Sequence, residues 1–381
     1  MFFEKNIVCL FIVALFVGIP VSFSKAPYDK GKECISVGLI GEFKNYSSKA
    51  NRIFGEEISR GIEIGKIYLN SNSRNNCFKF TTIDIDKTVA NTPGLIKKHS
   101  QNGIHLYIGL GLSDQALMAS DALRENNSVL ISPTASSRDL VNNKKIILLY
   151  PTNDLIAQKM AQEAYKKGAR NVLSVYLKNN SYSVNMAKNF RIEFEKLGGR
   201  ITKEIIIRHE EGSLFGGNIF SEISKYDFTH IFVPLYELDV AKFITQAFRN
   251  HLVKKYIATD SWGTHSTTIK GLIEKFKIDV IIPRIYDYTS SFYINKFFMD
   301  EFTRKYSILP SDLSAFSFES VLLANALVHK CGTDVKNWDV FVCLKKTAPF
   351  ASTSGHLTLF GNNSFKRKFK IETNNSWGND L

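Results

Sequence analysis

The chain has 381 residues, of which 44% are hydrophobic and 22% charged. This length and composition allow two ordinary domains with cores of their own and exclude a disordered protein. The formal net charge is +13, but the basic residues are scattered singly over helix-like segments, with no basic stripe carrying stacked aromatics. We therefore expect no nucleic-acid binding, and a solvated basic surface suited to an anionic membrane or partner.

Residues 1–24 have the pattern of a secretory signal peptide. Lys5 precedes an apolar run over residues 7–19, Pro20 breaks the helix, and the small residues Ser22 and Ser24 follow at the spacing a signal peptidase prefers. The alternative is a retained anchor, but an apolar run of about 13 residues is shorter than the roughly 20 needed to cross a bilayer. We expect cleavage after Ser24, with Ala26 as the second choice, and an exported, soluble, periplasmic mature chain.

Strand-like and helix-like segments alternate along the chain. The expected strands cover residues 35–40, 78–85, 105–109, 129–131, 146–150, 171–177, 200–207, 230–234, 255–258 and 281–286. The expected helices cover residues 56–70, 89–101, 115–126, 154–167, 184–197, 219–225, 239–250, 293–306 and 314–329. A hairpin-like tail pairs 356–360 with 368–372. This order predicts an α/β protein with doubly wound parallel sheets.

The alternating pattern occurs in two successive series, which predicts two similar α/β lobes. No evident linker separates the series, so we expect lobes joined by several crossing strands. The first lobe is expected to comprise residues 27–149 plus 286–345. The second is expected to comprise residues 150–285 plus 346–381.

Four cysteines remain after the expected signal peptide. An even number of widely spaced cysteines in an exported chain favours disulfides over metal ligands or a nucleophile. Cys34 and Cys77 each precede an expected strand, so their sulfurs start side by side if those strands are parallel neighbours. Cys331 ends one helical pattern and Cys343 lies in the next. We predict both bridges, with buried free thiols as the alternative.

Five short polar segments each follow an expected strand. They are Leu-Ser-Asp at 112–114, Ser-Pro-Thr-Ala-Ser at 132–136, Ser-Tyr-Ser at 181–183, Leu-Tyr at 235–236 and Thr-Asp-Ser at 259–261. Polar residues just past the carboxyl ends of parallel strands line the ligand crevice of α/β proteins. Hydroxyls, phenols and one carboxylate should therefore converge in a pocket for a small zwitterion.

Enzyme signatures are missing from the sequence. It contains no Gly-x-Ser-x-Gly, His-Glu-x-x-His, P-loop or Cys-x-x-Cys motif. Its eight histidines show no paired metal spacing. We expect no enzymatic activity, no cofactor and no metal, although an enzyme of unknown chemistry stays an alternative.

Several sequence stretches carry a family resemblance. They are Val37–Gly41, Phe54-Gly55 ahead of Gly61, Tyr107–Gly109 with Ser113, Ile131–Ser136, Lys196–Gly199 and Gly355–Phe360. In this order and spacing, the chain from Ile35 to about Thr373 resembles the type I periplasmic solute-binding proteins, in particular the branched-chain amino-acid binding proteins of ABC importers. The resemblance implies a two-lobed fold that closes over its ligand.

The resemblance also implies which residues bind the ligand. The matching positions are Ser113, Thr134 and Ser136 in the first lobe, and Tyr182, Tyr236 and Asp260 in the second. In the family, the position of Ser113 gives a hydroxyl to the ligand carboxylate, and the loop that matches Thr134 and Ser136 gives the ligand a carbonyl and a hydroxyl. The acid pairs with the ligand ammonium. Hydroxyls can donate to a carboxylate without adding a buried positive charge, and an ammonium needs a charged acceptor.

Each of these residues also has a simpler interpretation. Ser113 and Ser136 precede helix-like segments and could be N-caps. Asp260 could be a turn residue, and the two tyrosines could serve ordinary packing. The sequence departs from the family at Asp260, where the best-known relatives carry Glu. It also departs at Phe54, in place of a frequent tyrosine, and at Leu112, in place of a cysteine found in some relatives.

We therefore expect the substrate-binding protein of an ABC importer, which binds an amino acid or a similar zwitterion and docks as a monomer on a membrane permease. Closure is expected to be a hinge motion favoured by a ligand that touches both lobes. The alternative is the ligand-sensing domain of a signalling system with the same fold.

Overall fold

The computed structural model describes residues 34–44, 49–71, 76–85, 89–208, 219–252, 254–263 and 267–373. The expected signal peptide and both of its cleavage sites lie outside these residues. Among the described residues, no helix combines the length and apolar character needed to cross a membrane.

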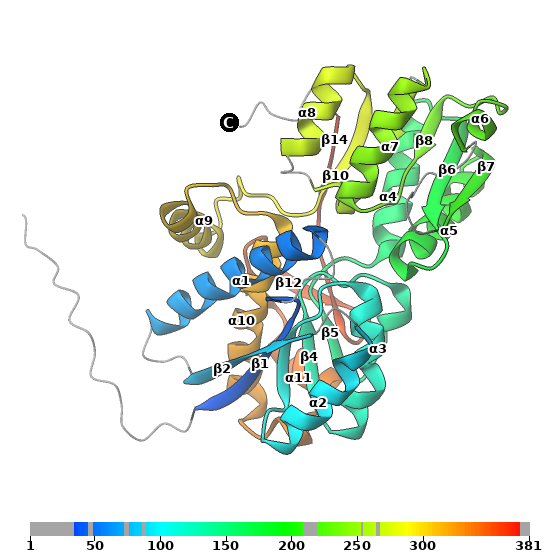
Figure 1. The fold of residues 1–381 in the computed structure, drawn as a ribbon. Coiled ribbons are helices and arrows are strands. Elements are labelled where there is room, and N and C mark those ends of the chain that lie inside the picture. Colours follow the sequence, from blue (N-terminus) through cyan, green and yellow to red (C-terminus); the bar gives the residue numbers. More distant parts are fainter. Residues whose placement is uncertain are drawn as a thin grey trace, which may run out of the picture. The chain divides into compact units, whose positions relative to one another are not determined.

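Eight strands form the first sheet, in the order β11-β12-β13-β5-β4-β3-β1-β2 (Figure 1). Their bounds are β1 Ile35–Gly41, β2 Phe78–Asp84, β3 Leu106–Gly109, β4 Val129–Ser132, β5 Ile146–Leu148, β11 Phe350–Ser352, β12 Gly355–Phe360 and β13 Ser364–Lys366. The first five strands pair in parallel, so their carboxyl ends share one edge of the sheet.

Helices cover both faces of this sheet. They are α1 Lys49–Asn70, α2 Thr92–Gln101, α3 Ser113–Glu125, α9 Tyr293–Tyr306, α10 Asp312–Cys331 and α11 Val340–Thr347. Alternate strand residues enter different cores: Val37 and Leu39 pack into the cluster that contains residues of α1 and α10, while Ile40 packs with residues of α2 and α3. This period-2 alternation explains why these strands are apolar on both faces.

Helices α1 and α10 pack closely because of two glycines in α1. A Cβ on Gly61 would lie 2.0 Å from the Ser314 carbonyl oxygen, and one on Gly65 would lie 2.7 Å from the Val321 side chain. The Ser314 hydroxyl also donates to the Glu57 carboxylate at 2.6 Å. The first lobe, defined here as the eight-stranded sheet with its helices, depends on this contact.

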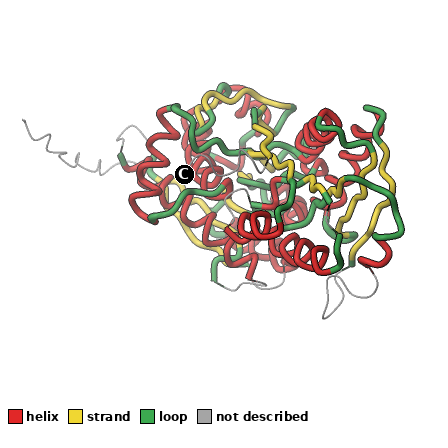
Figure 2. Tube along the Cα trace, turned by 90° about the horizontal axis from the view of Figure 1, so that it is seen from above, coloured by secondary structure: helices red, strands yellow, loops and turns green. Residues whose placement is uncertain are grey.

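Six strands form the second sheet, in the order β14-β10-β9-β8-β6-β7. Their bounds are β6 Asn171–Leu177, β7 Arg200–Ile207, β8 His230–Phe232, β9 Lys255–Ile257, β10 Val280–Arg284 and β14 Lys370–Thr373. Its helices are α4 Asn153–Lys166, α5 Ser181–Lys196, α6 Ile219–Ile223, α7 Glu237–Arg249 and α8 Thr267–Phe276. This sheet and these helices are the second lobe; Figure 2 shows strands between helices in both lobes.

The chain passes between the two sheets three times within the described residues. The passes follow β5, β10 and β13. Joining by several crossing segments agrees with the sequence expectation. At the last pass, Arg367 forms an ion pair with Glu319 in which both side chains are fully buried, and Arg284 pairs with Glu372 at 2.7 Å. One pair joins the tail to helix α10 of the first lobe, and the other joins it to strand β10 of the second sheet.

The expected tail hairpin is wrong in its pairing. Strand β12 pairs with β13 and β11, whereas β14 pairs antiparallel with β10 of the other sheet. Residues 350–366, which the sequence placed in the second lobe, are therefore hydrogen-bonded into the first sheet. Alternating apolar residues in the tail predict that a strand forms. They do not predict which sheet edge the strand pairs with, because that depends on the tertiary structure.

Both predicted disulfides are present. Cys34 bonds to Cys77 beside the first paired residues of β1 and β2, and Cys331 at the end of α10 bonds to Cys343 in α11. The sequence missed helix α8, in which Gly271 interrupts the helix-favouring residues. Ile269 and Ile273 of this helix are buried in the core of the second lobe, which overrides that local preference.

Candidate functional site

Ser113 organises the carboxyl edge of the first sheet. It is the first residue of α3, and Leu112 occupies the N-cap position, so the capping interpretation of Ser113 does not hold. Its hydroxyl oxygen accepts hydrogen bonds from the backbone N–H groups of Ser136 at 3.2 Å and Ser137 at 3.1 Å. Because the oxygen already accepts two bonds, the hydroxyl proton is left to act as a donor.

The loop after β4 brings Thr134 and Ser136 to the same edge. The Thr134 hydroxyl donates to the Gly111 carbonyl at 3.0 Å, and the Ser136 carbonyl accepts from Asn153 N–H at 2.8 Å. Ser137 rather than Ser136 caps the short 3₁₀ helix that follows. The three residues assigned to the first lobe therefore form one hydrogen-bonded loop cluster around the start of α3.

The second lobe brings its three assigned residues together at the carboxyl edge of its own sheet. The Tyr182 hydroxyl donates to Asp260 Oδ1 at 2.8 Å, and the rings of Tyr182 and Tyr236 stack with centroids 5.4 Å apart. Asp260 begins a 3₁₀ turn that follows β9. It is therefore both a turn residue, which was the simpler interpretation, and the acceptor of the Tyr182 hydrogen bond.

Two residues that the sequence analysis missed, Tyr150 and Asp312, extend this cluster. The Tyr150 hydroxyl donates to Asp312 Oδ2 at 3.3 Å, and Tyr150 also bonds to Asp260. Tyr150 ends an expected strand, so the strand-end rule applied there would have found it. Asp312 begins α10 after the short connection over residues 307–311, and no local pattern indicates it.

Burial is the largest influence on the pKa values of the two acids in this cluster. Burial raises the pKa of Asp260 to about 6, although hydrogen bonds from Tyr182 and Tyr150 act in the opposite direction. Burial also raises the pKa of Asp312 to about 7, and the charge of Asp260 adds to that increase. The pKa of Tyr182 lies well above its ordinary value, because the phenol is buried beside Asp260. Such acids favour a neighbouring positive charge.

Side chains of the two lobes also bond to each other beside the cluster. Asp114 in the first turn of α3 accepts from Asn180 Nδ2 at 3.2 Å and from Ser181 N–H at 3.3 Å, at the start of α5. Asn185 Nδ2 donates to Asp139 Oδ2 at 3.3 Å. Asp114 belongs to one of the predicted strand-end segments, but no role was predicted for it.

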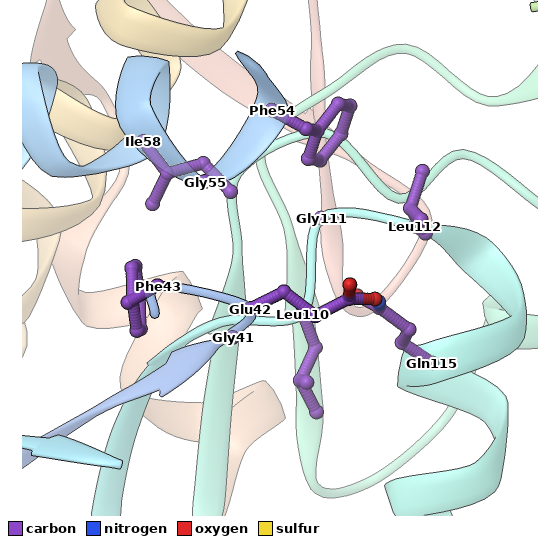
Figure 3. A pocket seen from close by; sticks show the side chains of 10 residues that line it. All are labelled: Gly41, Glu42, Phe43, Phe54, Gly55, Ile58, Leu110, Gly111, Leu112 and Gln115. Atoms are coloured by element: carbon purple, nitrogen blue, oxygen red, sulfur yellow. The ribbon is translucent and has the colours of Figure 1, made fainter. Parts of the chain in front are cut away.

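A cavity lies beside the loop cluster of the first lobe (Figure 3). It is lined by Gly41, Glu42, Phe43, Phe54, Gly55, Ile58, Leu110, Gly111, Leu112 and Gln115. None of the six assigned ligand residues lines it, but Leu112 directly precedes Ser113. A Cβ on Gly111 would lie 2.6 Å from Thr134 Oγ1 and 2.8 Å from the Phe54 ring, so glycine permits this close approach.

The described residues contain no group of three or more His, Cys, Asp or Glu side chains that could hold a metal ion. The first-lobe cluster has hydroxyl groups at the edge of the first sheet. The second-lobe cluster has carboxylates and phenols at the edge of the second sheet. Such a set can bind a small polar molecule with separate negative and positive groups.

Several solved structures share this fold. A leucine-binding protein from Thermotoga maritima has a TM-score of 0.75 and 16% identity, covering 89% of this chain and 97% of its own. A solute-binding protein from R. palustris in complex with benzoate has a TM-score of 0.76 and 18% identity, covering 89% and 92%. A branched-chain amino-acid binding protein from Streptococcus pneumoniae in complex with isoleucine has a TM-score of 0.74 and 17% identity, covering 89% and 95%.

Sequence comparison identifies the family of the chain. No curated protein matches the chain significantly. The family model described as periplasmic binding protein matches residues 84–369, which is well over half of the chain. With the type I two-lobe fold described above, the chain belongs to the periplasmic binding protein family.

Proposed function

We propose that this protein is the extracytoplasmic substrate-binding subunit of an ABC importer and binds an amino acid, or a similar small zwitterion, between its lobes. On this proposal the chain is exported, delivers its ligand to a membrane permease and leaves it chemically unchanged. The first lobe comprises residues 27–149 and 286–345 together with strands β11–β13, and the second comprises 150–285 with β14.

The hydrogen-bonded pair Tyr182–Asp260 is the observation that carries this proposal. The carboxylate is oriented by a phenol at 2.8 Å, and burial raises its pKa to about 6, so the ionised acid favours a neighbouring positive charge. A ligand ammonium would supply that charge, because an opposite charge within hydrogen-bond distance favours the ionised acid. An aromatic acid such as benzoate carries no positive group and would bring a further negative charge to Asp260 and Asp312.

The ligand carboxylate fits the edge of the first sheet. The Ser113 hydroxyl lies where the 13-residue helix α3 begins and accepts from the Ser136 backbone N–H, and the first backbone N–H groups of a helix favour an anion. A zwitterion bound in this way touches both lobes. Its contacts would join the two lobes in addition to the hydrogen bonds of Asp114. The ligand would therefore favour the closed form over an open one.

A thermal-shift screen tests the proposal. The purified protein is heated with each common amino acid and, separately, with benzoate. We expect at least one amino acid to raise the melting temperature, because a ligand that binds only the folded state stabilises it. Titration calorimetry with that amino acid should then give heat with the wild type and none with Asp260→Asn.

The matched control is Asp279→Asn, which removes an exposed carboxylate from the same lobe. This variant should bind as the wild type does. Stronger stabilisation by benzoate than by any amino acid would contradict the proposal, and so would unchanged amino-acid affinity in Asp260→Asn.

A further inference from the structure

We propose that Leu110 is a positioning residue for the expected carboxylate site: its buried side chain holds a strained backbone turn, and that turn sets where the Ser113 hydroxyl lies. The inference rests on the proposed function, because it takes Ser113 as part of the ligand site. It goes beyond that function, because it assigns a role to a residue that acts on the ligand through another. Figure 3 shows Leu110 in the turn that leads from β3 to α3.

The backbone of Leu110 has an unusual conformation for a bulky apolar residue. Its φ is +47°, in the left-handed region, where the Cβ of an L-residue is crowded. Among the described residues, the other non-glycine positions with positive φ are Asn127, Asn142, His251, Lys277 and Ser307. These are polar or charged, and each lies within two residues of the end of an α-helix or 3₁₀ helix. Leu110 is apolar and precedes a helix, so helix termination does not explain its conformation.

Two kinds of contact hold Leu110 in this conformation. Its side chain is 0% exposed and belongs to the core cluster that contains Ile40 and Tyr107. Its backbone N–H donates to the Ile40 carbonyl at 3.0 Å, and its own carbonyl accepts from the Ser132 hydroxyl at 3.0 Å. A strained conformation persists only where the surroundings determine it in this way, and such residues cluster at ligand sites.

The turn itself does not require a leucine. Glycine adopts a left-handed conformation without strain, and Gly109 and Gly111 already flank the position. A Cβ on Gly109, whose φ is +137°, would lie 1.9 Å from the Ile40 carbonyl oxygen, so glycine is needed there. At position 110 the leucine side chain adds an anchor in the core. The anchor removes conformational freedom that consecutive glycines would have.

The turn is bonded to the loop after β4 at three successive points. At the first, the Leu110 carbonyl accepts from the Ser132 hydroxyl, and at the second, the Gly111 carbonyl accepts from the Thr134 hydroxyl. At the third, the Ser113 hydroxyl oxygen accepts from two backbone N–H groups of the loop. Because the bonds follow one another in order along both segments, a displacement at Leu110 also displaces Ser113.

Two substitutions separate strain from packing. Leu110→Ala removes the anchor and keeps a Cβ in the left-handed region, whereas Leu110→Gly removes both. We expect both variants to melt below the wild type, and the glycine variant to melt about 1–3 °C above the alanine variant. Scanning calorimetry checks this. A glycine variant that melts no higher than the alanine variant overturns the inference, because residue 110 is then not strained.

Amide hydrogen exchange measures the positioning without any ligand. The N–H groups of Ser136 and Ser137 bond to the Ser113 hydroxyl, and we expect their exchange to be slow in the ligand-free wild type. Fast exchange there overturns the inference without any variant, and so does not depend on how the variants fold. In Leu110→Gly both groups should exchange about tenfold faster. The control is Leu123→Ala, a buried leucine of α3 in the same core cluster, which should lower the melting temperature and leave their exchange unchanged.

Calorimetric titration measures the effect on binding. The titrant is whichever common L-amino acid raises the melting temperature of the wild type most. We expect Leu110→Gly to lower the affinity for it by about tenfold and Leu123→Ala to change that affinity by less than about threefold. Leu110→Met keeps an apolar side chain of similar volume and should also bind within about threefold of the wild type.

The remaining outcomes distinguish this inference from the proposed function. If the wild type binds an amino acid and Leu110→Gly binds it equally well, Leu110 serves packing only, and the proposed function stands. The same conclusion follows if Leu110→Gly and Leu123→Ala lose affinity equally. If no amino acid stabilises the wild type, the proposed function fails and this inference fails with it.

Discussion

The Tyr182 hydroxyl donates a hydrogen bond to Asp260 Oδ1 at 2.8 Å, although 78 residues separate the two in sequence. Each residue lies just past a strand of the second sheet, Tyr182 after β6 and Asp260 after β9. The phenol orients the carboxylate. It also stabilises the ionised form, in opposition to the effect of burial on the Asp260 pKa.

Replacing Tyr182 by phenylalanine should weaken amino-acid binding. The variant keeps the ring that stacks on Tyr236 but loses the bond to Asp260. The pKa of Asp260 should then rise above its value of about 6, so that less of the carboxylate is ionised near neutral pH. We expect a loss of about 1.5 kcal/mol, roughly tenfold in affinity, by calorimetry at pH 7.

The control for this variant is Tyr165→Phe, which removes a phenol elsewhere in the second lobe, where the ring packs on Phe194. Its affinity should match that of the wild type. Equal affinities for all three proteins at pH 7 would show that the Tyr182 bond does not support ligand binding.

Amino-acid affinity should rise with pH through the range in which Asp260 ionises. The pKa of Asp260 is raised from 3.8 to about 6 and that of Asp312 from 3.8 to about 7. A ligand ammonium binds the ionised acids, so binding releases protons below these values. We expect the dissociation constant to fall as pH increases from about 5 to about 7 and then to level off. A pH-independent constant would exclude a role for these acids.

The same two groups should affect the stability of the ligand-free protein. Because the folded pKa values lie above the unfolded ones, the folded state holds more protons, and unfolding releases them between about pH 4 and pH 7. The contribution of these acids to the free energy of unfolding therefore becomes less favourable as pH rises through that window. Asp260→Asn cannot titrate, so its melting temperature relative to the wild type should increase with pH. A constant difference over the window would contradict the shift.

Asp114→Ala should loosen the closed arrangement of the lobes. The substitution removes the bonds that Asp114 accepts from Asn180 and Ser181. Ligand binding would then lose part of the interlobe stabilisation, and we expect affinity to fall by roughly three- to tenfold, mainly through faster dissociation. Stopped-flow measurement of dissociation would check this. Asp121→Ala, at an exposed position of the same helix, is the control, and an equal effect of both variants would refute the prediction.

Gly61→Ala should destabilise the first lobe. The added Cβ would lie 2.0 Å from the Ser314 carbonyl oxygen, so α1 and α10 must separate. Such overpacking costs about 1–3 kcal/mol, measurable by urea denaturation. The matched variant Gly271→Ala in α8 meets no atom within 4 Å and should stabilise by roughly 0.5–1 kcal/mol. If both variants change the free energy of unfolding in the same direction, the contact between Gly61 and the Ser314 carbonyl does not limit how closely α1 and α10 pack.

Local sequence patterns identified most of the secondary structure. Apolar runs in β1 and β6 and helical spacing in α9 carry enough periodic signal to place those elements, and α9 was predicted with its observed bounds. The patterns failed where local preference and tertiary packing disagree. Helix α8 contains Gly271 and was missed, and helix α1 begins seven residues before the predicted start.

The candidate site shows the same division. Ser113, Tyr182 and Asp260 could be named because each follows a strand, and parallel strands end at one edge. Asp312 could not be named, because it begins a helix and approaches Tyr150 across 162 residues. Glu42 follows β1, but its partner Gln115 lies in α3, and only the folded chain shows that the two bury each other.

By itself, the sequence determined the alternation that gives two α/β lobes and the polar residues at their strand ends. These follow from periodicity and order along the chain, which are local properties. Only the tertiary structure decided which sheet edges accept the tail strands, which acids lie together and which side chains form the cavity. Those features depend on contacts between residues far apart in sequence. The energies of such contacts cannot be derived from any one segment alone.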